Sequence, residues 1–128
     1  MDFIEIIHKR YLELAYLLAS SDGNLDKQEE EEAKAYKPKE ISATKNNDLI
    51  KQTKEELSRN ELSYTNSIRE LNELCRKDEK IFLLNLMFKI ITVDGFVKNE
   101  EIELLKNIAD ALDLEKKLFE DLKEKNLI

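Results

Sequence analysis

The chain has 128 residues, a length that fits one domain built around a single core. Its 28 acidic residues outnumber its 21 basic ones, and the net charge of −7 repels phosphate backbones and anionic membranes, so we expect no nucleic-acid partner. Only 2 Gly and 1 Pro interrupt a composition rich in charged helix-forming residues. The composition therefore predicts an all-α fold.

The sequence also bears on the cellular compartment. A single cysteine, Cys75, cannot form an internal disulfide, which favours a reducing compartment, and we expect a cytoplasmic protein. The acidic start of the chain lacks the basic region of a signal peptide. The longest apolar stretch, residues 81–91, is interrupted by Asn85 and Lys89 and is shorter than the roughly 20 residues that a bilayer requires. We predict no membrane span.

Apolar residues recur at steps of three and four over residues 3–20 and predict an amphipathic core helix. Asp22-Gly23 follows as a turn signal, and Asp26 with Glu29 three residues later predicts a helix cap with a reciprocating carboxylate. The helix that begins there, at about residues 27–36, contains four consecutive glutamates and few apolar residues. We expect it to lie outside and to be loosely held, until Pro38 ends it.

The next segment, within residues 30–60, is more polar and reads as a helical, partly mobile excursion, and residues 62–76 predict a further helix. We expect Asp78 to cap a helix whose residues 81–91 are apolar around most of their circumference and form the most buried element. Asp94-Gly95 then separates this helix from the next, and Asp113 is expected to cap the last one. Residues 1–128 thus predict one domain, a bundle of about seven helices.

The chain contains an internal correspondence. A shift of 72 residues places Asp22-Gly23 on Asp94-Gly95 and Glu29 on Glu101, and it aligns the apolar helices that precede both turns. The spacing is too long for a stacked solenoid, so we predict two related halves in a bundle with a pseudo-twofold repeat.

These residues resemble the TerB-like domains of tellurite-resistance and related stress-response proteins. The hallmark of that family is an apolar helix, Asp-Gly, and a Glu seven residues after the Asp, present twice. Residues 90–105 match it more closely than the first copy, and Asp113 stands where a Gly is common. The resemblance implies the all-α fold and an acidic, metal-binding surface.

The residues themselves are compatible with a divalent cation but not with an EF-hand. In both copies an apolar residue, Leu18 or Ile90, stands where an EF-hand loop needs its first carboxylate. A weaker site for Ca²⁺ or Mg²⁺ remains open, because carboxylates suit hard cations and the only His and Cys are far apart in sequence, which disfavours zinc. The candidate metal ligands are Asp22, Asp26, Glu29, Asp94 and Glu101.

A purely structural role for the same residues is an alternative. Asp-Gly makes a tight turn between helices, and the Glu suits the first turn of the next helix, where the helix dipole favours it. We find no nucleophile with a base at a telling spacing and no glycine-rich phosphate loop, and we expect His8 to be a half-exposed helix residue. The sequence therefore does not favour an enzyme, and a small hydrolase would have to show turnover.

The functional expectation follows from the resemblance. We expect a non-enzymatic TerB-like interaction or scaffold domain of a stress-response or phage-defence system, which binds another protein and is tuned by a divalent cation. The alternative is a metal-free helical adaptor that docks a protein partner through its acidic face at residues 29–32 and the basic segment at residues 34–59.

Overall fold

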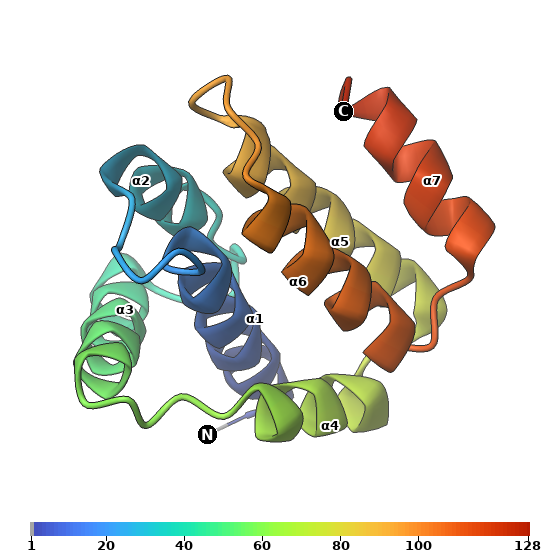
Figure 1. Cartoon of the computed structure of the whole chain (residues 1–128). Helices are drawn as coiled ribbons and strands as arrows, with labels where there is room; N and C mark the ends of the chain where they lie inside the picture. The colour runs from blue at the N-terminus through green and yellow to red at the C-terminus, as the bar shows by residue number, and fades with distance from the viewer. Residues whose placement is uncertain (1) are drawn as a thin grey trace.

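The computed structural model describes residues 2–128, which form seven α-helices and no strand (Figure 1). The all-α prediction and the predicted number of helices are confirmed. In chain order the helices are α1 (Phe3–Ala19), α2 (Lys27–Ala35), α3 (Ala43–Ser58), α4 (Tyr64–Leu74), α5 (Lys77–Thr92), α6 (Asn99–Ala111) and α7 (Lys116–Lys125).

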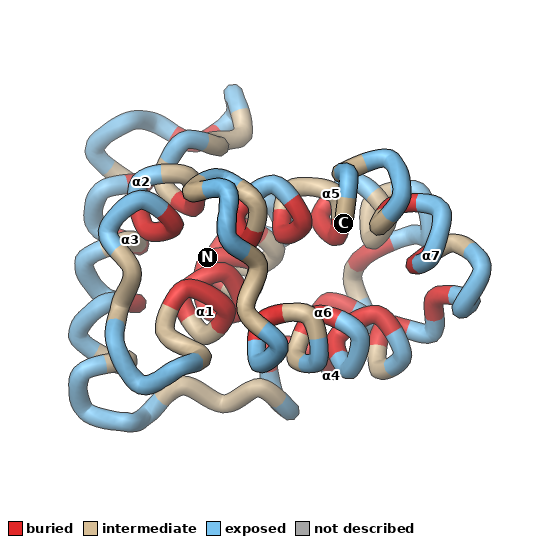
Figure 2. The backbone as a smooth tube through the Cα atoms, turned by 45° about the horizontal axis from the view of Figure 1, so that its top comes forward, coloured by how far each residue is buried: buried red, intermediate tan, exposed pale blue. Residues whose placement is uncertain are grey.

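Helix α1 lies at the centre of the bundle and contacts α2, α3, α4, α5 and α6 (Figure 1). Nearly every residue of its second half is buried, as the red tube of Figure 2 shows. Helix α5 was expected to be the most buried element, and this expectation is wrong, because its Phe82 side chain is 50% exposed. The difference arises because α1 is covered on more sides by other helices than α5 is.

The polar residues of α1 become buried because other helices supply their partners. The His8 Nε2 atom lies 2.7 Å from the Asn46 side-chain oxygen on α3, and Ser67 on α4 donates to Glu13 at 2.7 Å. Lys9 also donates to Glu13, at 2.7 Å. The expectation that His8 is half-exposed is therefore wrong, since its side chain is only 1% exposed.

Helix α2 is not an outer, loosely held element. It packs against both α1 and α5, and it buries Glu29 and Glu30 together with Ala33. Burial of Glu30 is tolerated because Tyr16 donates to its carboxylate at 2.8 Å and Lys54 lies 3.1 Å from it. Glu30 can therefore be buried because it has partners on α1 and α3, and the sequence pattern of α2 does not reveal these partners.

Two predicted helix caps are also wrong. Helix α5 begins two residues earlier than expected, so Asp78 lies in its first turn, and the Arg76 N–H donates to Glu79 at 2.9 Å. Helix α7 begins after Glu115, and Asp113 instead adopts a left-handed conformation with φ of 65°. Glycine adopts this conformation without strain, which explains why a Gly is common at this position in the family that the sequence resembles.

The polar segment within residues 30–60 forms most of α2 and all of α3. Helix α3 packs on α1 through Asn46, Leu49 and Thr53, while its outer face is exposed. Its helical nature is confirmed, and its mobility stays a prediction.

Candidate metal centre

The two Asp-Gly turns have the same local geometry. Gly23 and Gly95 adopt φ values of 99° and 81°, in the left-handed region that glycine enters without strain. The preceding carboxylates each accept a backbone N–H two residues later, Asp22 from Asn24 at 3.1 Å and Asp94 from Phe96 at 3.0 Å. The Asp-Gly sequence therefore builds each turn, while the pseudo-twofold relation of the complete halves stays a prediction.

The helix after each turn carries a fully buried glutamate in its first turn. In α2 the Asp26 carboxylate caps the helix by accepting the Glu29 N–H at 2.9 Å, as predicted. The predicted return bond is wrong, because neither carboxylate oxygen of Glu29 has a hydrogen-bond partner. In α6 the glutamate does turn back, and the Lys98 N–H donates to Glu101 Oε1 at 3.0 Å. The Glu29 carboxylate is thus free to face other groups.

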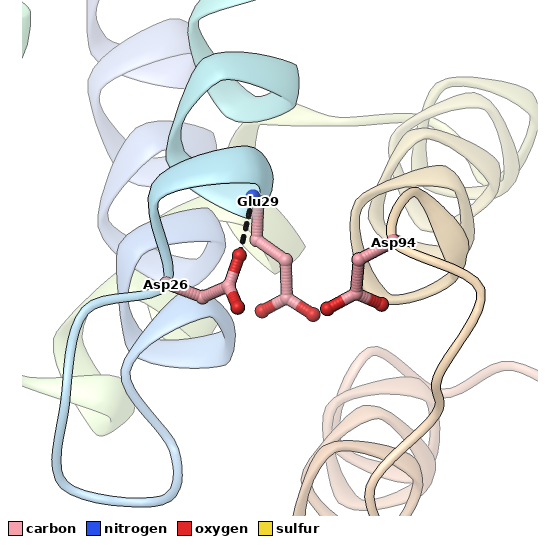
Figure 3. A group of neighbouring side chains, drawn as sticks. All are labelled: Asp26, Glu29 and Asp94. Atoms are coloured by element: carbon pink, nitrogen blue, oxygen red, sulfur yellow. Dashed lines mark hydrogen bonds between the residues drawn. The ribbon is translucent and has the colours of Figure 1, made fainter.

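Three acids from two distant parts of the chain meet at Glu29. One carboxylate oxygen from each of Asp26, Glu29 and Asp94 lies within 4.8 Å of the others. Figure 3 shows the Glu29 carboxylate between the two aspartates, which approach it from the start of α2 and the end of α5. The Glu101 carboxylate adjoins Glu29 as well. We call these four residues the acid cluster.

The acid cluster is electrostatically unfavourable without a positive charge. Burial, followed by the nearby carboxylates of Glu101, Asp26 and Asp94, raises the pKa of Glu29 well above the usual range of a glutamate. Both oxygens of Glu29 and Oε2 of Glu101 are buried without a hydrogen-bond partner. Buried carboxylate oxygens normally have donors, so this arrangement favours either a shared proton or a bound cation.

Asp22 lies apart from the acid cluster. Its second carboxylate oxygen accepts a hydrogen bond from the Lys98 ammonium group at 2.7 Å, which joins the first turn to the start of α6. Of the five predicted ligands the structure therefore brings three within 4.8 Å of one another, and a fourth, Glu101, adjoins Glu29. The sequence analysis did not identify Lys98 as a functional residue. The 72-residue shift could have indicated it, because it aligns Lys98 with the acid Asp26.

Comparison with protein families identifies the chain. The family described as Tellurite resistance protein TerB matches residues 9–124, a range that includes both turns and the whole acid cluster. The chain belongs to the TerB family. Neither the comparison with curated proteins nor that with solved structures gives a match. Within the described part of this TerB domain, no helix has the length and apolar content needed to cross a membrane.

The acid cluster fits a hard divalent cation. Oxygen atoms bound to one Ca²⁺ ion at about 2.3–2.6 Å are separated by up to roughly 5 Å, which accommodates the observed spacing within 4.8 Å. Mg²⁺, with bonds of about 2.0–2.1 Å, needs its oxygen ligands closer to one another than Ca²⁺ does. Asp26, Glu29 and Asp94 would hold the ion, and Glu101 adjoins Glu29. A bound ion would supply the positive charge that Glu29 lacks.

Two surfaces near the turns of this TerB domain are apolar. Phe96 follows Asp94-Gly95 and is 77% exposed, and Val93 precedes the same turn. A separate groove of about 970 Å³ lies between the first turn, the end of α3 and α6. Its apolar lining comes from Leu17, Leu25, Leu57, Tyr64 and Leu104.

Proposed function

We propose that this TerB domain is a non-enzymatic interaction module whose acid cluster binds one divalent cation, Ca²⁺ or Mg²⁺, shared between its two halves. The observation that carries the proposal is the Glu29 carboxylate, which is fully buried, has no hydrogen-bond donor and faces two aspartates (Figure 3).

The charge balance of the cluster favours a cation over a proton alone. One shared proton can relieve the contact between Glu29 and Glu101, but it leaves Asp26 and Asp94 close to that pair. A divalent ion neutralises two charges and accepts oxygen ligands from all sides. Because Asp26 and Glu29 lie at the start of α2 and Asp94 lies after α5, the ion would link these two elements.

An interaction role is supported by what lies next to the ion. Figure 3 shows one Asp94 oxygen facing Glu29, and the Asp94 carboxylate also accepts the Phe96 N–H at 3.0 Å. An ion held by Asp94 would therefore fix the loop that presents the exposed Phe96 side chain. Exposed aromatic side chains are frequent anchors in protein interfaces. By analogy with the TerB family, we propose that this module acts in a cytoplasmic stress-response or phage-defence system.

The chemistry of the remaining reactive residues supports a non-enzymatic role. His8 is buried against Asn46, and burial lowers its pKa, which favours the neutral imidazole. Burial raises the pKa of Cys75 to about 11, which keeps it a thiol instead of a nucleophilic thiolate near neutral pH.

The metal-free adaptor is the second candidate, but the acidic face on which it depends is smaller than its sequence suggests. Glu29 and Glu30 are buried, so α2 offers only Glu31 and Glu32 to a partner. Docking led by charge would weaken as ionic strength rises, whereas cation-dependent docking would respond to the identity of the cation.

Calorimetric titration with Ca²⁺ and with Mg²⁺ tests the proposed site. We expect wild-type protein to bind one ion and to gain thermal stability, and we expect Asp94→Asn to lose both effects. Asp78→Asn, at the other end of α5, is the matched control, because it removes the same charge from an exposed residue. Absence of binding to the wild type at millimolar Ca²⁺ and Mg²⁺, or equal binding to Asp94→Asn, would refute the site.

A further inference from the structure

We propose that Asp22 is a positioning residue that holds the Lys98 ammonium group away from the acid cluster, so that the Asp22–Lys98 ion pair sets the affinity for the cation. This inference rests on the cation site proposed above and concerns its regulation by two residues outside the acid cluster.

The first observation is that both Asp22 oxygens are engaged elsewhere. One accepts the Asn24 N–H at 3.1 Å and the other accepts the Lys98 ammonium at 2.7 Å. Asp94, which occupies the equivalent position in the second turn, has one oxygen facing Glu29 in the cluster. The two aspartates therefore have different roles despite their equivalent turns.

The second observation explains this asymmetry. The 72-residue shift aligns Asp26 with Lys98, so the residue before the second helix start is a base where the first half has an acid. Asp26 joins the acid cluster, whereas Lys98 reaches across to the first turn and pairs with Asp22. The lysine at position 98, where the first half has an acid, thus gives Asp22 a positively charged partner outside the acid cluster.

The third observation is the position of the Lys98 backbone. Its N–H donates to Glu101 Oε1 at 3.0 Å, so the lysine side chain begins beside the cluster. The hydrogen bond to Asp22 comes first among the contacts that raise the pKa of Lys98, and the charges of Glu101 and Glu29 also contribute. The flexible four-carbon stem of a lysine permits the ammonium to turn from Asp22 toward these two carboxylates.

The consequence is a competition between two cations. With Asp22 charged, the ammonium stays on the first turn and the acid cluster is available to a divalent ion. With Asp22 neutral, the ammonium pairs with the cluster and repels an incoming divalent ion, and we expect about a tenfold loss of affinity.

A double-mutant cycle measured by calorimetric titration with Ca²⁺ tests this competition. We expect Asp22→Asn to lower the affinity about tenfold and Lys98→Met to raise it. The combined variant should bind at least as tightly as the wild type, because no ammonium remains to compete. Asp22→Glu should retain the pairing and stay close to the wild type, and Asp78→Asn controls for the loss of one negative charge.

The outcomes separate this inference from the proposed site. If Asp22→Asn costs the same affinity in the wild-type and Lys98→Met backgrounds, Asp22 is a direct ligand and the inference is wrong. If Asp22→Asn costs nothing in either background, the ion pair does not influence the site and the inference is equally wrong. In both cases the site itself stands as long as Asp94→Asn abolishes binding. A wild type that binds no Ca²⁺ overturns the site and the inference together.

Discussion

Replacement of Glu29 by glutamine tests the electrostatics of the acid cluster without a large change in shape. In the cation-free protein the pKa of Glu29 is raised, first by burial and then by the neighbouring carboxylates. The folded state therefore holds a proton that the unfolded chain releases above its ordinary pKa of about 4.3. Rising pH then favours the unfolded state, so Glu29 makes the protein less stable as pH increases from that value toward its raised pKa.

The magnitude follows from proton linkage. One proton held only by the folded state lowers the free energy of unfolding by up to about 1.4 kcal/mol per pH unit, or up to about 3 kcal/mol between pH 6 and 8. Glutamine carries no titrating proton, so Glu29→Gln removes this slope and stabilises the cation-free protein at pH 8. The effect of His8 is common to both proteins, since its lowered pKa adds stability as pH rises through about 6.5.

Urea unfolding in the presence of a chelator, at several pH values between 6 and 8, measures the slope. Glu31→Gln on the same helix is the control, since Glu31 is exposed and its replacement should leave the wild-type slope unchanged. A further arm adds Ca²⁺ at a free concentration of 100 times its dissociation constant, which should stabilise the wild type by about 2.7 kcal/mol and Glu29→Gln by much less. Equal pH slopes for the wild type and Glu29→Gln would refute the assignment of a raised pKa to Glu29.

Three further predictions concern other parts of the molecule. Glu13→Gln should lower the free energy of unfolding by about 3 kcal/mol in urea titrations, because it weakens the buried pairing of Lys9; a loss below 1 kcal/mol would contradict this. Asp113→Gly should raise the melting temperature through a gain of up to about 1 kcal/mol, since glycine adopts the positive φ of this residue more readily, and an unchanged or lower value would argue against strain there. Phe96→Ser should abolish Ca²⁺-dependent capture of a protein partner, while Phe3→Ser, an equally large change on the exposed α1 terminus, should not; equal capture by both variants would exclude Phe96 as the contact.

Much of the architecture was predictable from local signals. The three- and four-residue spacing of apolar side chains indicated the helices, and the two glycines indicated turns whose positive φ values only glycine adopts easily. The cap at Asp26 was predictable for the same reason, since a side-chain oxygen at a helix start satisfies a free backbone N–H. The caps at Asp78 and Asp113 failed because these helices begin after Arg76 and Glu115, residue types that N-cap preference does not favour.

The candidate site was predictable in composition but not in arrangement. The duplicated Asp-Gly and Glu pattern selected Glu29, Asp94 and Glu101, and the helix-cap pattern added Asp26. The duplicated pattern also selected Asp22, which pairs with Lys98 across 76 positions of the chain. No local pattern predicts that contact, because it depends on how the start of α6 lies against the first turn. The burial of Glu30 and of His8 likewise required partners on other helices.

The amino-acid sequence alone determined that this TerB domain is helical, where its two turns lie and which acids surround them, because these properties depend on neighbours within a few residues. Only the tertiary structure decided that α1 is the central helix, that Glu29 loses all its hydrogen-bond donors and that acids from both halves share one cluster. Those properties depend on packing between distant helices, where burial removes water and turns an ordinary surface carboxylate into a group that requires a proton or a cation.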